Sequence, residues 1–502
     1  GDKKMADLWE RFLASLAEAM ALRRIKSVLE WDQEVNMPPK GARARAEHLA
    51  VVAGLEHRAW TSPALREMIE SLQSRESELD PESAAILRET KWEVDRLSRL
   101  PEALVRALTE AASAGFSAWV DARRNADFSL FEPYLQRLVS LSREKADCLG
   151  WEESPYDALL EEYERGMTHR MIRELFENLA ARQAELVAAI VDRQEAAGGY
   201  RRPPEGGPWS AGAQRQLTEA VLQDMGYDFQ AGRQDLSPHP FTTTFDVGDV
   251  RITTRFDEND FLSGLSSSMH EAGHALYEQG MPDAWRRTPL ADAPSLGMHE
   301  SQSRFWENII GRSRPFCLYL KQRAEGLFQG TFFMPDPETL YRALTCVEPS
   351  LIRVEADECT YNLHVVLRFE IEAALLEGTV SVKDVPELWN GRMRAYLGLT
   401  PPDDARGCLQ DVHWSHGAFG YFPTYALGNL YAAQLCQALR RDLPDLWHRV
   451  EQGQFGDILA WLREKIHRCG RTKTAGELLT SVTGMPPSPE PFLHYLKEKF
   501  LS

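Results

Sequence analysis

The segment His270-Glu271-Ala272-Gly273-His274 carries the pattern His-Glu-x-x-His. On an α-helix, residues four positions apart share a face, so the imidazoles of His270 and His274 can reach one metal ion. Glu271 points to another side, where it would hydrogen-bond the water at the metal and take its proton. Gly273 costs about 1 kcal/mol of helix propensity, and it leaves space beside the metal face for a substrate. The segment therefore predicts a helical metal site with Glu271 as general base.

A third metal ligand has to come from elsewhere, because catalytic sites usually have three protein ligands and one open position. Glu278 lies one turn further along the same helix, but a single straight helix does not easily place three ligands around a tetrahedron. The segment Met298–Gln302 follows the loop Pro282–Gly297, and a second helix there would pack beside the first. By residue type alone, His299 and Glu300 are both candidates.

Helical spacing of apolar residues dominates the rest of the chain. The patterns predict helices over 5–29, 102–123, 129–148, 168–197, 211–225, 335–345, 354–377, 428–441 and 456–468. Residues 241–246 and 250–256 differ, because they are rich in Thr and apolar residues and flank Val247-Gly248-Asp249, which indicates a hairpin. The expected fold is mainly α, with a small antiparallel sheet next to the metal helix.

Breaks rich in Gly and Pro divide these patterns, and the stretch Gly198–Pro208 is the best linker candidate. None of the breaks is long enough to require separate domains. We therefore expect one domain over residues 1–502, with a helical N-terminal part at about 1–200 and a metal-site part at about 209–502.

Composition excludes several classes of protein. Lys and Arg total 57 against 75 for Asp and Glu, a net charge of −18, which argues against nucleic acid as a partner. No run of 18 apolar residues appears, so we expect no membrane-spanning helix. The seven cysteines are scattered and form no Cys-x-x-Cys, which indicates neither a disulfide framework nor a thiolate site and favours a reducing cytoplasm.

Six short motifs follow one another between residues 239 and 414, and a further segment near the N-terminus joins them. They are His239-Pro240-Phe241, Asp249-Val250-Arg251-Ile252-Thr253, His270–His274, His299-Glu300-Ser301-Gln302, Ile352-Arg353-Val354-Glu355-Ala356-Asp357, Gly407–Trp414, and Trp31-Asp32-Gln33 with Met37-Pro38. With these motifs the chain resembles the M32 metallocarboxypeptidases of the thermostable Thermus type.

The resemblance implies a large helical, zincin-like metallopeptidase with a deep central groove, assembled as a homodimer. It implies that single C-terminal residues are removed, with broad specificity, from peptides that have a free terminal carboxylate. It also implies one divalent ion per chain, zinc first and cobalt or manganese as alternatives, and it favours Glu300 over His299 as the third ligand.

Two arginines of these motifs are candidates for binding the substrate. Arg353 and Asp357 are four residues apart, so they form either an ion pair on a helix or a site where Arg353 grips the terminal carboxylate of the peptide. Arg251 is the second candidate, although in a hairpin it can pair across strands instead.

Polar aromatic residues near residue 420 are candidates for the chemistry itself. His413 could stabilise the oxyanion of the tetrahedral intermediate, and Tyr421 could donate to that oxyanion or to the substrate carboxylate. The alternative is that both are packed aromatics with satisfied polar tips. His239 is read as a structural or supporting residue.

Two other functions are compatible with the predicted metal site. An oligo-endopeptidase would share the metal and Glu271 but have an open groove, and it would not require a free terminal carboxylate. A peptide-binding scaffold with a silent metal site would have no need of a base at Glu271.

Overall fold

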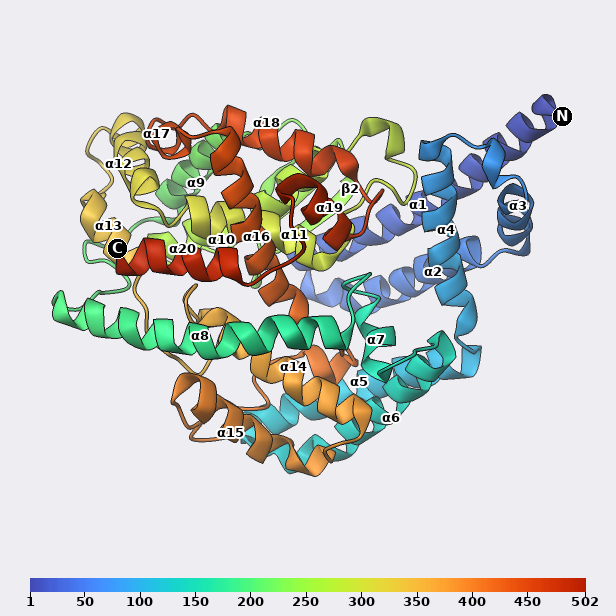
Figure 1. The fold of residues 1–502 in the computed structure, drawn as a ribbon, viewed down its shortest axis with the longest axis horizontal. Coiled ribbons are helices and arrows are strands. Elements are labelled where there is room, and N and C mark those ends of the chain that lie inside the picture. Colours follow the sequence, from blue (N-terminus) through green and yellow to red (C-terminus); the bar gives the residue numbers. More distant parts are fainter.

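The computed structural model describes residues 1–502, and helices make up most of it (Figure 1). The first eight helices precede the predicted linker. In Figure 1, α1 to α4 lie at the end of the molecule that carries the N-terminus, and the long α8 crosses the middle of the view. Their bounds are α1 (Asp2–Val35), α2 (Ala42–Trp60), α3 (Pro63–Gln73), α4 (Pro81–Arg99), α5 (Glu102–Asn125), α6 (Glu132–Leu149), α7 (Pro155–Leu160) and α8 (His169–Ala196).

The second part of the chain contains twelve further helices and two short segments that matter for the site. The helices are α9 (Ala211–Met225), α10 (Phe261–Gln279), α11 (Leu296–Arg304), α12 (Arg314–Phe328), α13 (Pro337–Leu344), α14 (Tyr361–Glu377), α15 (Val385–Leu397), α16 (Pro423–Asp442), α17 (Leu446–Glu451), α18 (Gly456–Lys465), α19 (Ala475–Thr483) and α20 (Glu490–Leu501). The segments are the π-helical η5 (Phe305–Ile310) and the 3-10 segment η6 (Arg353–Glu355).

Three groups of buried apolar residues hold these helices together. A small one joins α1, α3 and α4 around Phe12 and Leu72. The largest contains residues of α5 to α8 together with α14, α15, α16 and α20, so helices from both sides of the linker share it. The third surrounds α10, and α16 contributes Leu427 to the largest group and Leu439 to the third. The division into one domain with two parts stays a prediction.

All nine helices predicted from the apolar spacing are present, with ends shifted by a few residues. The prediction for 354–377 is wrong over its first two turns, because α14 begins at Tyr361. The carboxylate of Asp357 accepts hydrogen bonds from the backbone N–H groups of Cys359 and Thr360, both at 2.9 Å, so it precedes the helix as a turn residue. Gly378 ends α14 with φ 77°, as a C-cap glycine does.

The sheet has three strands in the order β1-β3-β2. The predicted hairpin is confirmed, because β2 (Thr242–Asp246) and β3 (Asp249–Thr254) pair antiparallel. The added strand β1 (Gln234–Leu236) pairs parallel to β3, so the sheet is mixed and not wholly antiparallel as expected. Three residues are too few for a period to show in the sequence. β3 packs against α10, where the Ser268 hydroxyl lies 2.8 Å from that of Thr254.

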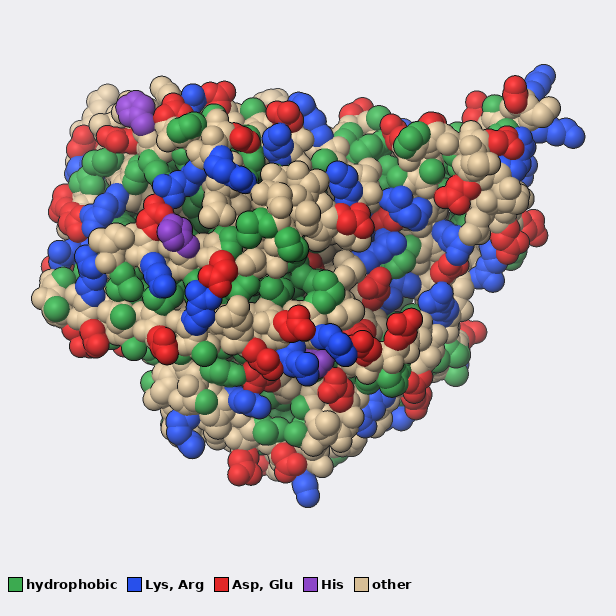
Figure 2. All heavy atoms as spheres, in the orientation of Figure 1, with side chains coloured by type: hydrophobic (Ala, Val, Ile, Leu, Met, Phe, Trp, Pro, Cys, Tyr) green, Lys and Arg blue, Asp and Glu red, His purple; other side chains and the backbone are tan.

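The surface shows no large area of one charge on the face in Figure 2, where acidic and basic side chains are interspersed.

None of the helices combines the length and the apolar character that crossing a membrane requires. All seven cysteines are free.

Candidate metal centre

Helices α10 and α11 bring together the three residues predicted to bind a metal ion. Nε2 of His270 lies 3.7 Å from Oε1 of Glu300, and Nε2 of His274 lies 3.4 Å from Oε2 of the same carboxylate. One ligand atom from each residue lies within 4.8 Å of the others. Donors about 2.1 Å from a tetrahedral ion are about 3.4 Å apart, so two imidazole nitrogens this close to the carboxylate of Glu300 suit a divalent ion such as zinc.

The charges of His270 and Glu300 stabilise each other, whereas burial lowers the pKa of His274. Burial lowers the pKa of His270, but the carboxylates of Glu300 and Glu307 outweigh it and raise that pKa to about 9. Burial also acts to raise the pKa of Glu300, yet His270 and His274 hold it well below its usual range. The carboxylate is therefore ionised at neutral pH and available as a ligand.

Two glycines let the helices approach closely enough to form this cluster. A Cβ on Gly273 of α10 would lie 2.6 Å from the carbonyl oxygen of Gln302 and 2.6 Å from Cα of Ser303. A Cβ on Gly428 of α16 would lie 2.6 Å from Cβ of Glu300. Helix α11 therefore lies between two glycines. The expectation that Gly273 leaves room for substrate is wrong, because the backbone of α11 fills that space.

Gly273→Ala tests this close packing. Alanine favours a helix by about 1 kcal/mol over glycine, but here its methyl group would meet backbone, which cannot rotate away. Overpacking of this kind costs about 1–3 kcal/mol, so we expect a net loss of thermal stability together with weaker zinc binding. The matched control is Gly326→Ala in α12, where a Cβ meets nothing within 4 Å and alanine should stabilise. A Gly273 variant as stable as wild type, with unchanged zinc affinity, would contradict the close-packing argument.

Further side chains surround the three ligand candidates. Nδ1 of His270 lies 2.8 Å from Oε1 of Glu307. Arg304 donates from Nε to Glu300 at 3.0 Å and from Nη1 to Glu307 at 3.2 Å, so it links the two carboxylates. His299, the rival ligand, does not point at the cluster, because its Nδ1 lies 2.6 Å from Nδ1 of His274, behind that ring. Glu307 and Arg304 were not predicted, although Arg304 lies one turn after Glu300 at the end of α11, and Glu307 follows three residues later in η5.

Glu271 is buried, with 8% of its surface exposed, on the helix that carries both histidines. The hydroxyl of Thr242 in β2 lies 2.5 Å from its Oε2 and 3.0 Å from its backbone oxygen. The hairpin thus holds the carboxylate in place. The sequence indicated the Thr-rich strand, but it did not indicate which threonine would reach Glu271.

Arg353 pairs with Asp411 and not with Asp357, the partner that the alternative to a substrate-binding role gave it. Its Nε and Nη2 donate to Oδ1 of Asp411 at 3.1 and 2.9 Å, and its Nη1 donates to the hydroxyl of Tyr361 at 2.9 Å. Oδ2 of Asp411 accepts from Nε of Arg368 at 2.6 Å. The predicted pair with Asp357 is therefore absent, because residues 353 and 357 do not share a helix.

His413 and Tyr421 lie together, with ring centroids 5.3 Å apart. Nε2 of His413 is 3.1 Å from the hydroxyl of Tyr425, and Nδ1 is buried without a partner. Burial lowers the pKa of His413 to about 4, so the ring is neutral at pH 7. Tyr425 was missed by the sequence reasoning. Its ring lies 4.9 Å from the guanidinium carbon of Arg353, which joins this aromatic group to the arginine.

Arg251 and His239 lie apart from these contacts. Arg251 donates from Nε and Nη2 to Asp249, two residues earlier on the same face of β3, at 2.8 and 3.0 Å. Its guanidinium carbon also lies 4.5 Å from the ring centroid of Trp31. His239 is exposed, and its carbonyl accepts a hydrogen bond from Ser237. No contact joins either residue to the three ligand candidates.

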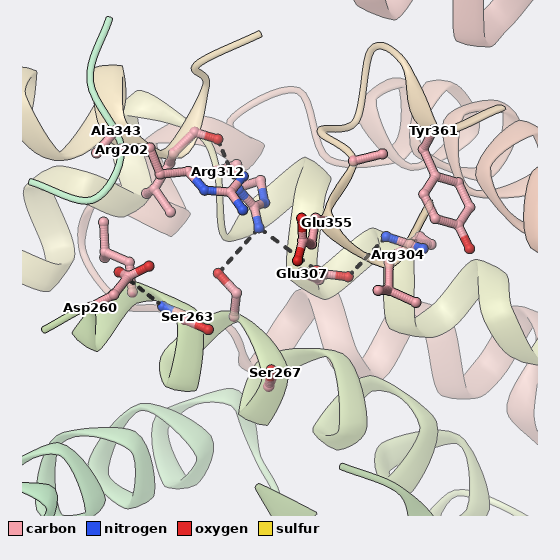
Figure 3. A pocket seen from close by; sticks show the side chains of 15 residues that line it. Arg202, Asp260, Ser263, Ser267, Arg304, Glu307, Arg312, Ala343, Glu355 and Tyr361 are labelled. Carbon is pink, nitrogen blue, oxygen red and sulfur yellow. Dashed lines mark hydrogen bonds and ion pairs between the residues drawn. The ribbon is translucent and has the colours of Figure 1, made fainter. Parts of the chain in front are cut away.

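A cavity of about 160 Å³ lies beside Arg304 and Glu307, the residues that contact Glu300 and His270 (Figure 3). Ser263 and Ser267 line it from α10, two turns and one turn before His270 on the same face. Arg304 and Tyr361 line its other side, with the guanidinium carbon 4.4 Å from the ring centroid. The cavity is therefore lined by Arg304, which contacts Glu300, and by Tyr361, which contacts Arg353. A deep groove across the molecule stays a prediction.

Known proteins resemble this chain over almost its whole length. A family model described as carboxypeptidase Taq (M32) metallopeptidase matches residues 11–500. The chain is 41% identical to thermostable carboxypeptidase 1 of Thermus thermophilus, with 98% of each chain covered. It is 38% identical to carboxypeptidase 1 of Bacillus subtilis, covering 99% of this chain and 98% of that protein. The crystal structure of an M32 carboxypeptidase from Deinococcus radiodurans has a TM-score of 0.94 at 37% identity, covering 98% and 99% of the two chains.

Proposed function

The chain belongs to the M32 family of carboxypeptidase Taq metallopeptidases, and we propose that it releases single residues from the free C-terminus of peptides at the site on α10 and α11. It is a metal-dependent carboxypeptidase and therefore a hydrolase. The observation that carries the proposed site is the convergence of two imidazole nitrogens and one carboxylate on a single point.

His270, His274 and Glu300 would hold the ion, and their separations support this assignment. Zinc suits two nitrogens and one oxygen best, with cobalt or manganese as alternatives. A divalent ion bound there polarises the scissile carbonyl and makes water a stronger acid. Glu271 would accept the proton of the attacking water at its carboxylate and give it to the leaving amine. Its hydrogen bond from Thr242 supports this role by fixing the carboxylate.

Arg353 would bind the terminal carboxylate of the peptide. It is a buried guanidinium joined through Tyr361 and Arg304 to the metal cluster, and its charge supports the recognition of an anion. His413 and Tyr421 would donate to the oxyanion or to that carboxylate. The neutral ring of His413 and its unpartnered Nδ1 support a donor role. Arg251 is a weaker candidate, since its contacts are with Asp249 and Trp31.

Broad specificity, a homodimer and a cytoplasmic location are further proposals that rest on the resemblance and on the cysteine pattern. The oligo-endopeptidase alternative is not favoured, because the family and the relatives are named as carboxypeptidases. The substrates that we propose are peptides, with neither nucleic acid nor a membrane as partner.

Mass spectrometry of a peptide digest tests the proposed function. A peptide with a free C-terminus should become shorter by one residue at a time from that end, and a chelator should stop the reaction because the ion is removed. Zinc added after the chelator is removed should restore it. The same peptide with an amidated C-terminus should be cleaved poorly. Internal cleavage, or equal cleavage of the amidated peptide, would instead favour the endopeptidase.

A further inference from the structure

Three side chains form a line that leads away from the candidate metal site. Nδ1 of His274 lies 2.6 Å from Nδ1 of His299, and Nε2 of His299 lies 2.7 Å from Oε1 of Glu278. The side chains of His299 and Glu278 are 15% and 11% exposed, so the line is largely shielded from solvent. Because Glu278 is on α10 and His299 is on α11, the line also joins the two helices that supply the ligands.

Only one placement of protons lets His274 bind a metal and satisfies both contacts. Nε2 faces Glu300, so it has to be free of a proton in order to bind the ion, and the ring proton is then on Nδ1. That N–H donates to Nδ1 of His299, which must be unprotonated. The proton of the His299 ring is then on Nε2, from where it donates to the carboxylate of Glu278.

The other candidate histidine ligand, His270, contacts a carboxylate without a residue in between. Nδ1 of His270 meets the carboxylate of Glu307 directly at 2.8 Å. A carboxylate behind a metal-bound imidazole fixes the orientation of the ring and makes its other nitrogen a stronger ligand. In this structure the carboxylate of Glu307 contacts His270 directly, whereas the carboxylate of Glu278 reaches His274 through the ring of His299.

We propose that His299 and Glu278 are positioning residues for the metal ion, which act through His274 by fixing its tautomer and ring orientation. The proposal rests on the proposed metal site and adds to it two residues that do not touch the ion. His299 thereby has a role other than that of third ligand. Its ring is also held by Tyr277, whose centroid lies 4.9 Å away, so the line has little freedom to rearrange.

The test compares zinc affinity among four variants, by competition with a chromophoric chelator at one pH. His299→Leu removes both hydrogen bonds, and Glu278→Gln replaces the carboxylate with a neutral acceptor. His299→Asn keeps an acceptor near the position of Nδ1 but loses the link to Glu278. The matched control is His467→Gln, because His467 is fully buried, stacks on Tyr277 and contacts Gln302 of α11 without joining the line.

We expect His299→Leu to weaken zinc binding by about 10–100-fold, as loss of such a partner does elsewhere. His299→Asn and Glu278→Gln should weaken it less, and His467→Gln should stay near wild type. The absorption bands of the cobalt-substituted protein should shift in His299→Leu and Glu278→Gln but not in the control. Thermal unfolding of the metal-free proteins shows which variants fold. If His299→Leu does not fold, the zinc affinity of Glu278→Gln tests the positioning role in its place.

Two results would overturn the proposal while leaving the metal site intact. One is a zinc affinity of both His299→Leu and Glu278→Gln within threefold of wild type. The other is a loss of zinc affinity in His467→Gln equal to that in His299→Leu, which would mean that packing alone explains the loss. A wild-type protein that binds no zinc or cobalt would contradict the metal site itself, and the positioning role with it.

Discussion

Replacing Glu271 with Gln should lower kcat by about 10²–10⁴-fold, the usual contribution of a general base. Zinc content and peptide affinity should stay near wild type, because Glu271 is not one of the three ligand candidates. The substitution keeps the size of the side chain. The amide oxygen of Gln can still accept the hydrogen bond from Thr242, so the fold around it should be preserved.

The measurement is kcat on a free-ended peptide together with metal analysis of the same sample. The matched control is Thr242→Val, which removes the hydroxyl that holds the carboxylate but keeps the carboxylate itself. We expect a smaller loss for this variant, since a misplaced base still accepts protons. Near-normal kcat in Glu271→Gln would remove Glu271 from the mechanism.

Arg353→Ala should lower kcat/KM for free-ended peptides by about 10–150-fold, the equivalent of one charge-assisted contact of roughly 1.5–3 kcal/mol. A carboxypeptidase has to distinguish a terminal carboxylate from the neutral amide of an internal residue. On a chain of net charge −18, a local cation is needed for this. Amidated peptides should be poor substrates of the wild type, and the substitution should change them little.

The structure supplies a control that separates anchoring from folding. Arg368 pairs with the same carboxylate, Asp411, but it is fully buried and cannot touch a substrate. Arg368→Met therefore removes a charge from the same cluster without removing the proposed anchor. Only Arg353→Ala should reduce the preference for free-ended over amidated peptides. If both variants weaken both peptides equally, Arg353 is structural and supports Asp411.

Long helices and the shared face of His270 and His274 were predictable because each rests on local spacing. A helix such as α8 repeats its apolar residues over 28 positions, and His270 and His274 share a face on any helix. The family resemblance is what selected Glu300 over His299, since both are plausible ligands by residue type. The structure now shows why the two neighbours differ, with Glu300 facing Nε2 of His274 and His299 facing Nδ1.

Contacts between distant segments could not be predicted from spacing. The partner of Arg353 is Asp411, 58 residues later, and the loop that brings them together has no period of its own. Asp357, the alternative partner, uses its oxygens on backbone N–H groups instead, which a carboxylate just before a helix commonly does. The close packing of Gly273 against α11 could not be predicted from the sequence either, because it depends on how a second helix is placed.

The placement of α11 between Gly273 and Gly428 has a consequence for the choice of metal. Rotation of side chains can widen or narrow many binding sites, but here the backbone of α11 has little room to shift, because it lies so near both glycines that an added Cβ on either would collide with it or with Glu300. Ionic radius would then act together with donor chemistry in governing which divalent ions are accepted. Small ions such as zinc and cobalt would fit equally well, whereas a large ion such as cadmium would have to push two packed helices apart.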